Sequence, residues 1–299
     1  MDPYLDLAIG KTIKELRGSL GISQKELAKD ICTQSLISHI ESGSNIPNSV
    51  LLKLIAEKLG ITLDGLLLMS ENPTFDQFKK VESKVMRFIE ANDYKNALRI
   101  IEFEKSTPTY ENGGKVKQFF LWAEGVCHYY LTNDFTLAMR LLEQALNSTN
   151  NLIFSYQDAQ ILNSQGILYA EESMLEESTK TFKSILAIKD KVPSHILSIS
   201  PLLPKVYYNL AKVITMQGKY EESIKYCQEG ISYSENMESI SVLGELYFQI
   251  GLNYEKMQDY KQALLWLKKS QEIYKVKVRN PKWLTIITDK IDEVQFHLK

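Results

Sequence analysis

A five-fold internal repeat constrains the fold of this chain more than any other sequence feature. Each copy has a short polar turn, then a large ring or Leu, then a small residue three positions later. The large residues of the five copies are Tyr94, Phe135, Leu175, Tyr220 and Tyr260. They are spaced 40 to 45 residues apart. A period of this length predicts a stack of similar units, each burying its apolar face against its neighbours.

Upstream of the last four copies, large and small residues recur at helical spacing, for example Tyr247, Gly251 and Tyr254. Small residues allow paired helices to approach closely, and the rings fill the remaining gap. The sequence has no alternating β-branched runs bounded by hairpin turns, so we predict an all-α protein. The pattern resembles the tetratricopeptide repeat, which implies a right-handed superhelix of five degenerate copies over residues 75–275. A last helix over residues 280–299, with Pro281 in its first turn, is expected to cap the stack.

The first 70 residues predict a separate domain of short helices. Ser23 and Glu26 form a capping-box pattern at the start of a helix that we expect to end near residues 30–32. Thr33 is placed to cap the next helix, residues 34–42, which stops at Gly43. Two short helices joined by a tight turn predict a helix-turn-helix whose second helix enters the DNA major groove.

On that second helix, Ile37 and Ile40 are assigned to the core, whereas Gln34 is expected to face outward, where its amide suits adenine. This region resembles the lambda-repressor/Cro-type (XRE) family. The resemblance is carried by the string from Ser23 to Ala28, followed by Ser38-His39-Ile40-Glu41-Ser42-Gly43 and Pro47. His39 stands where that family commonly has Arg or Lys. The predicted DNA-contacting residues are Gln24, Lys25, Thr33, Gln34, Ser35, Ser38 and His39. The alternative is a helix-turn-helix that makes protein contacts only.

Pro73 interrupts the helical pattern between the two regions. We therefore predict a DNA-binding domain over residues 1–70 and a linker helix over residues 71–90 that leads into the first repeat. Inward-facing residues are predicted in the first helix, including Leu20, and in the fourth, including Leu54.

Composition excludes several other classes of protein. The chain has 35 Lys and Arg against 37 Asp and Glu, so its surface is not globally basic, although one small face can still bind DNA. It has no nucleotide-binding or metalloprotease motif, and its 4 His and 3 Cys are dispersed, so no enzyme activity, cofactor or metal is expected. No signal peptide or membrane-length apolar run is found, which favours a cytoplasmic protein.

A curved helical stack has a concave groove suited to an extended peptide. Asn163, Asn209 and Gln249 occupy nearly equivalent positions in three successive repeats. Because an amide both donates and accepts, a row of amides can bind a peptide main chain. The alternative is that these amides bond to neighbouring helices.

Together, the two regions resemble the peptide-responsive quorum-sensing regulators of the Rgg/Rap/NprR/PlcR/PrgX group, especially the PlcR-like regulators, over essentially the whole chain. The strings that carry this resemblance include Gln118-Phe119 with Trp122, Tyr208-Asn209 with Lys212, and Leu246-Tyr247 with Gln249. The resemblance implies a dimeric activator that binds an operator and a short re-imported peptide, with RNA polymerase as a further partner. The implied peptide-binding residues are Trp122, Asn163, Lys205, Tyr208, Asn209, Lys212 and Gln249.

The basic residues that the group places near the first repeat are not evident, since Glu90 and Asn92 stand there. We therefore expect the chain to answer to a peptide of its own. Two alternatives stay open: an adaptor that binds or dephosphorylates a response regulator, and a DNA-binding repressor whose repeats only oligomerise.

Overall fold

The computed structural model describes residues 3–71, 75–107, 110, 114–149, 154–189, 199–276 and 281–298. All regular elements among them are helices, which confirms the all-α prediction. Contacts within the chain divide it into two compact units, Met1–Asn133 and Asp134–Lys299.

The first unit begins with five short helices. These are α1 (Pro3–Ser19), α2 (Gln24–Ala28), α3 (Gln34–Glu41), α4 (Ser49–Lys58) and α5 (Leu63–Glu71). Helix α1 packs on α3 and α5, and α2 packs on α3. Each of the five helices contributes a fully buried residue to a single core: Ile13, Leu27, Ile37, Ile55 and Leu66. This arrangement is the predicted helix-turn-helix.

Side-chain caps begin these helices, and those of α2 and α3 are the predicted ones. Ser23 Oγ accepts a hydrogen bond from the Glu26 amide at 3.2 Å, and the Glu26 carboxylate accepts one from the Ser23 amide at 2.7 Å. Thr33 caps α3, and Asn48 caps α4. Helix α2 ends at Ala28, earlier than predicted, and Asp30 has a φ of 65°, a left-handed conformation in which the helix cannot continue.

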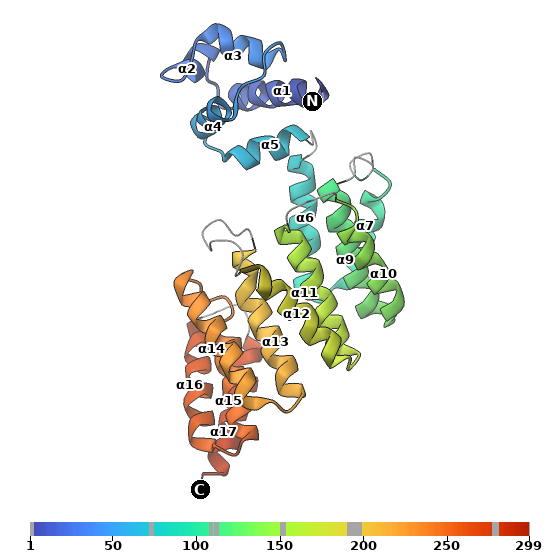
Figure 1. Ribbon diagram of the computed structural model, residues 1–299, viewed down its shortest axis with the longest axis vertical. Helices are drawn as coiled ribbons and strands as arrows, with labels where there is room; N and C mark the ends of the chain where they lie inside the picture. Colours follow the sequence, from blue (N-terminus) through green and yellow to red (C-terminus); the bar gives the residue numbers. More distant parts are fainter. Residues whose placement is uncertain are drawn as a thin grey trace. The chain divides into compact units, whose positions relative to one another are not determined.

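The remaining helices follow the helix-turn-helix along the chain. They are α6 (Phe75–Glu90), α7 (Tyr94–Glu104), α9 (Gly114–Thr132), α10 (Phe135–Leu146), α11 (Tyr156–Glu171), α12 (Leu175–Lys189), α13 (Leu203–Met216), α14 (Tyr220–Asn236), α15 (Leu243–Lys256), α16 (Tyr260–Val276) and α17 (Pro281–Phe296), with a 3₁₀ turn at Ser200–Leu202. In the second unit, each helix from α11 to α17 packs on the next, so the unit is a stack of antiparallel helices (Figure 1).

The turn of every repeat has the same backbone conformation. The first turn residue has a positive φ in all five copies, at Asn92, Asn133, Ser173, Gly218 and Gln258. After Asn92, Ser173, Gly218 and Gln258, the next amide bonds back to the preceding helix, a helix C-terminal motif that closes the pair. The polar turn residues of the repeat are thus those that reverse the chain between paired helices.

Small residues lie where paired helices cross. A Cβ at Gly166 in α11 would lie 2.7 Å from the ring of Phe182 in α12, and one at Gly251 in α15 would lie 2.8 Å from Leu267 in α16. The small residue of the repeat also forms a hydrogen bond, because Ser178 Oγ donates to the Gly166 carbonyl at 2.6 Å. The predicted alternation of small and large residues is therefore confirmed as helix-pair packing.

Two of the predicted inward residues are exposed. Leu20 is 53% exposed, since α1 ends at Ser19, and Leu54 is 39% exposed on α4, where Leu52 is buried instead. Residues 191–198 and Asn280 lie outside the described residues. No helix among the described residues has the length and apolar character that crossing a membrane requires.

Candidate functional site

The outward face of α3 carries the polar residues predicted to contact DNA. Gln34, Ser35 and His39 are exposed and Ser38 is half-buried, whereas Ile37 and Ile40 are buried. The capping side chain of Thr33, which is also exposed, accepts a hydrogen bond from the Leu36 amide at 3.2 Å. The apolar face of α3 therefore packs into the domain and leaves its N-terminal turn free to approach a ligand.

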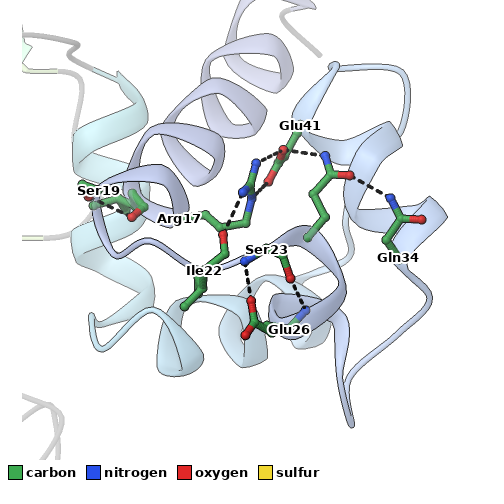
Figure 2. Close-up of polar contacts among 9 residues, drawn as sticks. Arg17, Ser19, Ile22, Ser23, Glu26, Gln34 and Glu41 are labelled. Atoms are coloured by element: carbon green, nitrogen blue, oxygen red, sulfur yellow. Dashed lines mark hydrogen bonds and ion pairs between the residues drawn. The ribbon is translucent and has the colours of Figure 1, made fainter.

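A chain of hydrogen bonds joins this turn to a buried ion pair (Figure 2). The Glu41 carboxylate accepts hydrogen bonds from Arg17 Nε at 2.6 Å and from Arg17 Nη2 at 3.0 Å. It also accepts one from Gln24 Nε2 at 2.8 Å. Gln24 Oε1 in turn accepts one from Gln34 Nε2 at 2.8 Å. Side-chain hydrogen bonds thus connect α1, α2 and α3, and the chain of bonds ends at the exposed Gln34.

The electrostatics of this chain keep Glu41 ionised. Burial by itself would raise the pKa of the Glu41 carboxyl, but hydrogen bonds from Arg17 and Gln24 and the Arg17 charge outweigh it, so the pKa lies below its ordinary value. The hydrogen bond to Glu41 likewise raises the pKa of the Arg17 guanidinium. The side chains of Glu41 and Arg17 are only 3% and 16% exposed.

Neither Arg17 nor Glu41 was among the residues predicted to be functional. The sequence feature that could have indicated a role is the position of Glu41, a carboxylate directly after Ile40 on a helix whose inward face is apolar. A buried carboxylate requires a cationic partner, and such a partner cannot be chosen among several basic residues without the fold.

An open hollow lies beside the predicted DNA-contacting turn. It has a volume of about 640 Å³ and is lined by Arg17, Ser23, Gln24, Lys25 and Gln34. Amide and cationic groups of this kind can bind the phosphates of a nucleic acid backbone.

The second unit contains a pocket of about 250 Å³ on helices α11 to α13. Its apolar wall includes Ile167, Phe182 and Met216, and its polar groups include Asn209 and Lys212. The arrangement can accept an apolar side chain and can donate and accept hydrogen bonds beside it.

The structure brings only part of the predicted amide row to this pocket. Asn209 lines it, and its Nδ2 donates to Asn163 Oδ1 at 2.9 Å. Asn163 and Gln249 are each 4% exposed, and Gln249 Nε2 donates to Thr215 Oγ1 at 2.8 Å. Bonding to neighbouring helices, the alternative considered above, therefore describes both buried amides.

The other predicted peptide-binding residues differ in exposure. Lys205 and Lys212 are exposed on α13, and Tyr208 is half-buried, where burial raises its pKa to about 12. Trp122 belongs to the first unit, on α9, and is 4% exposed. It packs against Phe119 with ring centroids 5.7 Å apart.

A buried polar network next to Gln249 was not predicted. The Thr215 hydroxyl donates to Asn253 Oδ1 at 2.6 Å, and Asn253 Nδ2 donates to Ser223 Oγ at 2.8 Å. Asn253 is fully buried and joins α13, α14 and α15 through these contacts. Asn253 follows Gln249 by four residues and so lies on the same helical face, and this spacing could have indicated its role from the sequence. No cluster of His, Cys, Asp and Glu suited to a metal occurs in the described part of the chain.

Comparison with known proteins agrees with both regions. Residues 82–278 match the RNPP family C-terminal domain, and residues 13–66 match a helix-turn-helix family. The structure of Bacillus thuringiensis PlcR in complex with the peptide PapR7 and DNA is 26% identical with a TM-score of 0.73, covering 92% of this chain and 100% of that chain. A comparison with curated proteins gave no match.

Two further structures support the same fold. Apo PlcR of Bacillus thuringiensis is 26% identical, with a TM-score of 0.64 and coverage of 95% of this chain and 98% of that chain. ComR from S. thermophilus in complex with DNA and its signalling peptide ComS is 15% identical, with a TM-score of 0.57 and coverage of 96% and 99%. The family and the fold are those of DNA-binding regulators and not of enzymes. The chain therefore belongs to the RNPP family, and its fold is that of the peptide-binding and DNA-binding regulators PlcR and ComR.

Proposed function

We propose that this protein is a transcription activator that binds its operator as a dimer and is controlled by a short imported peptide. The observation that carries the proposal is that one chain holds both a helix, α3, with an outward polar face and an open pocket on its repeats with an apolar wall and polar groups. PlcR, with the same succession of regions, has been seen with a peptide and DNA together.

In this proposal, α3 enters the major groove. Gln34 contacts adenine, while Ser35, Ser38 and His39 contact bases or phosphates. Gln24, Lys25 and Thr33, which come from α2 and the turn before α3, contact the DNA backbone and set the register of the domain. The exposure of Gln34, Ser35 and His39 supports these roles.

The peptide occupies the pocket beside Asn209 and Lys212. Asn209 exchanges its contact with Asn163 for contacts with the peptide main chain, and the apolar wall accepts a peptide side chain. Lys205, Tyr208 and Gln249 complete this surface in the bound state, in which Gln249 releases its hydrogen bond to Thr215. Trp122, buried on α9 in the first unit, stays a predicted peptide-binding residue. The exposed Lys205 and Lys212 add positive charge that favours an acidic group or the carboxylate end of the peptide.

Residues 1–70 then form the DNA-binding domain and residues 71–90 the linker helix. Five repeats over residues 75–275 bind the peptide and hold two chains together, and residues 280–299 cap the stack. The peptide acts by binding one curvature of the stack more tightly than the other. The curvature sets the spacing of two reader helices for half-sites about 34 Å apart or a multiple of that distance.

Three measurements test the proposal. Mass spectrometry of the protein purified from the organism that produces it identifies the co-purified peptide. Gel-shift assays with genomic DNA fragments of that organism compare DNA affinity with and without the peptide. Light scattering gives the oligomeric state, and transcription in vitro with RNA polymerase distinguishes activation from repression. Unchanged DNA affinity with the co-purified peptide would contradict the sensing role, and a peptide-bound monomer would contradict the dimer.

A further inference from the structure

The hydrogen-bond chain that ends at Gln34 has a direction, and the buried carboxylate sets it. An ionised carboxylate has no proton, so the Gln24 atom 2.8 Å from Glu41 Oε2 must be the amide nitrogen. Gln24 therefore turns its oxygen toward Gln34. Only an N–H of Gln34 can meet that oxygen, at 2.8 Å. The oxygen of the Gln34 amide consequently points away from the chain (Figure 2).

The hydrogen bonds at the Glu41 end of this series keep one donor-to-acceptor direction. Arg17 donates to both oxygens of Glu41, at 2.6 and 3.0 Å, and also donates through Nη1 to the Ile22 carbonyl at 2.8 Å. The Glu41 side chain is 3% exposed, so water does not replace these partners. A carboxylate held by a guanidinium in this way accepts hydrogen bonds only, which excludes the opposite orientation of the Gln24 amide.

At the far end, Gln34 is exposed and is the first residue of α3. Within the described part of the chain, its Oε1 has no hydrogen-bond partner, and one of the two Nε2 protons is used by Gln24. Gln34 thus presents an acceptor and a remaining donor side by side. Adenine offers the complementary pair in the major groove, a donor at N6 and an acceptor at N7, whereas guanine offers two acceptors, O6 and N7.

We propose that Glu41 is a positioning residue for base selection: through Gln24 it fixes the Gln34 amide so that α3 accepts adenine and rejects guanine at one base pair. A freely rotating glutamine can turn its NH₂ group toward both acceptors of guanine, and a held one cannot. This inference rests on the proposed function, because it requires α3 to lie in the major groove.

The test is selection from a randomised duplex DNA library by the full-length protein, followed by sequencing of the bound fraction. Gln34→Ala identifies the base pair that Gln34 reads, as the position where the preference for adenine over guanine is lost. We expect Glu41→Gln to lower that preference about tenfold at the same base pair and to leave other positions unchanged. The neutral amide that this substitution introduces can donate as well as accept, so it permits both orientations of the Gln24 amide. We call the chain of hydrogen bonds from Glu41 through Gln24 to Gln34 the relay.

Two further variants separate the relay from other effects. Gln24→Met breaks the relay but keeps the ion pair, and we expect the same loss of preference. Glu57→Gln is the matched control, since it removes one negative charge from an exposed side chain of α4. It is expected to leave the adenine preference as in the unchanged protein.

The outcomes distinguish the relay from the proposed function. If Gln34→Ala loses the preference but Glu41→Gln and Gln24→Met keep it, the relay is overturned and α3 is still the reader. A uniform loss of affinity in Gln24→Met, with unchanged base ratios, also overturns the relay, because Gln24 then makes only a backbone contact. If Gln34→Ala alters no position, the reader role itself fails, and with it the relay.

A measurement without DNA covers variants that fold poorly. NMR of the unmodified protein is expected to show one Gln24 and one Gln34 side-chain amide proton protected from exchange with water. Gln24→Met is expected to abolish the protection at Gln34. Rapid exchange of all these protons in the unmodified protein would overturn the proposal whatever DNA is selected.

Discussion

Arg17 and Glu41, 24 residues apart in the sequence, form a two-point ion pair that joins α1 to the end of the reader helix, with Nε–Oε1 at 2.6 Å and Nη2–Oε2 at 3.0 Å. This contact belongs to the core of the helix-turn-helix domain and also to its predicted DNA-binding side, because Gln24 bonds to the same carboxylate.

Replacing Arg17 with Met is expected to destabilise the domain by about 3–5 kcal/mol, because Glu41 would stay buried without its cation. Urea unfolding and hydrogen exchange of α1 to α4 would measure the loss. Lys53→Met is the control, since Lys53 and Glu57 are 3.7 Å apart with both side chains more than half exposed, and we expect a change of at most about 1 kcal/mol. Equal effects of the two variants would contradict the prediction.

The stability of the same domain is expected to depend on the Glu41 carboxyl in acid. Its folded-state pKa is below the ordinary value of 4.5, so the unfolded state binds more protons as the pH falls below 4.5. The stabilisation is therefore complete above that pH and is lost as the pH falls through the folded pKa. Urea unfolding of the unmodified protein and of Glu41→Gln over a pH series measures this component. A constant stability difference between the two proteins at all pH values would refute it.

Two glycines of α1 are expected to respond oppositely to the same substitution. A Cβ at Gly10 would lie 2.0 Å from the Ile40 carbonyl oxygen, so Gly10→Ala should force α1 and α3 apart and cost about 1–3 kcal/mol. Gly18 has no atom within 4 Å of such a Cβ, and Gly18→Ala should stabilise the helix by about 0.5–1 kcal/mol. Thermal unfolding of the pair measures both signs, and destabilisation by Gly18→Ala would count against the geometry of α1.

Asn209→Ala is expected to abolish the response to the co-purified peptide while the protein keeps its oligomeric state. It also removes the donor to the buried Asn163 Oδ1, which should cost up to about 1–3 kcal/mol of stability. Peptide-induced shifts in melting temperature and light scattering report the two effects separately. Asn236→Ala, at the exposed end of α14, is the control and should respond normally to the peptide. A normal response of Asn209→Ala would exclude Asn209 from the peptide site.

His39→Arg is expected to strengthen DNA binding, because a permanent charge replaces an exposed imidazole on α3. The slope of the logarithm of affinity against the logarithm of salt concentration should steepen by about one if the new charge meets a phosphate. Gln228→Arg adds the same charge to the exposed face of α14 and should leave the slope unchanged. The same increase in both variants would indicate a general charge effect and not a contact by position 39.

Much of the fold was predictable because its signals are local. The capping residues Ser23 and Thr33 act on backbone a few positions away, and the small residue Gly251 acts on the partner helix of the same repeat. Their spacing therefore indicated the helices and the helix pairs. Leu20 and Leu54 were assigned inward because they continue an apolar period, but helix ends and neighbouring helices determine which positions are covered.

The candidate site was predictable only in part, since its residues meet across the fold. The outward face of α3 followed from helical period alone. The repeat alignment gave equivalent positions to Asn163, Asn209 and Gln249, but not their environments, which depend on the helices that pack over each one.

The sequence alone determined the class of structure, a helix-turn-helix followed by helical repeats, because periodicity, caps and turns are properties of neighbouring residues. Only the tertiary structure decided that Arg17 pairs with Glu41, that Gln24 links this pair to Gln34, and which amide opens to the pocket. Hydrogen bonds depend on direction and on distances of about 3 Å, and a one-dimensional pattern does not specify these between separate helices.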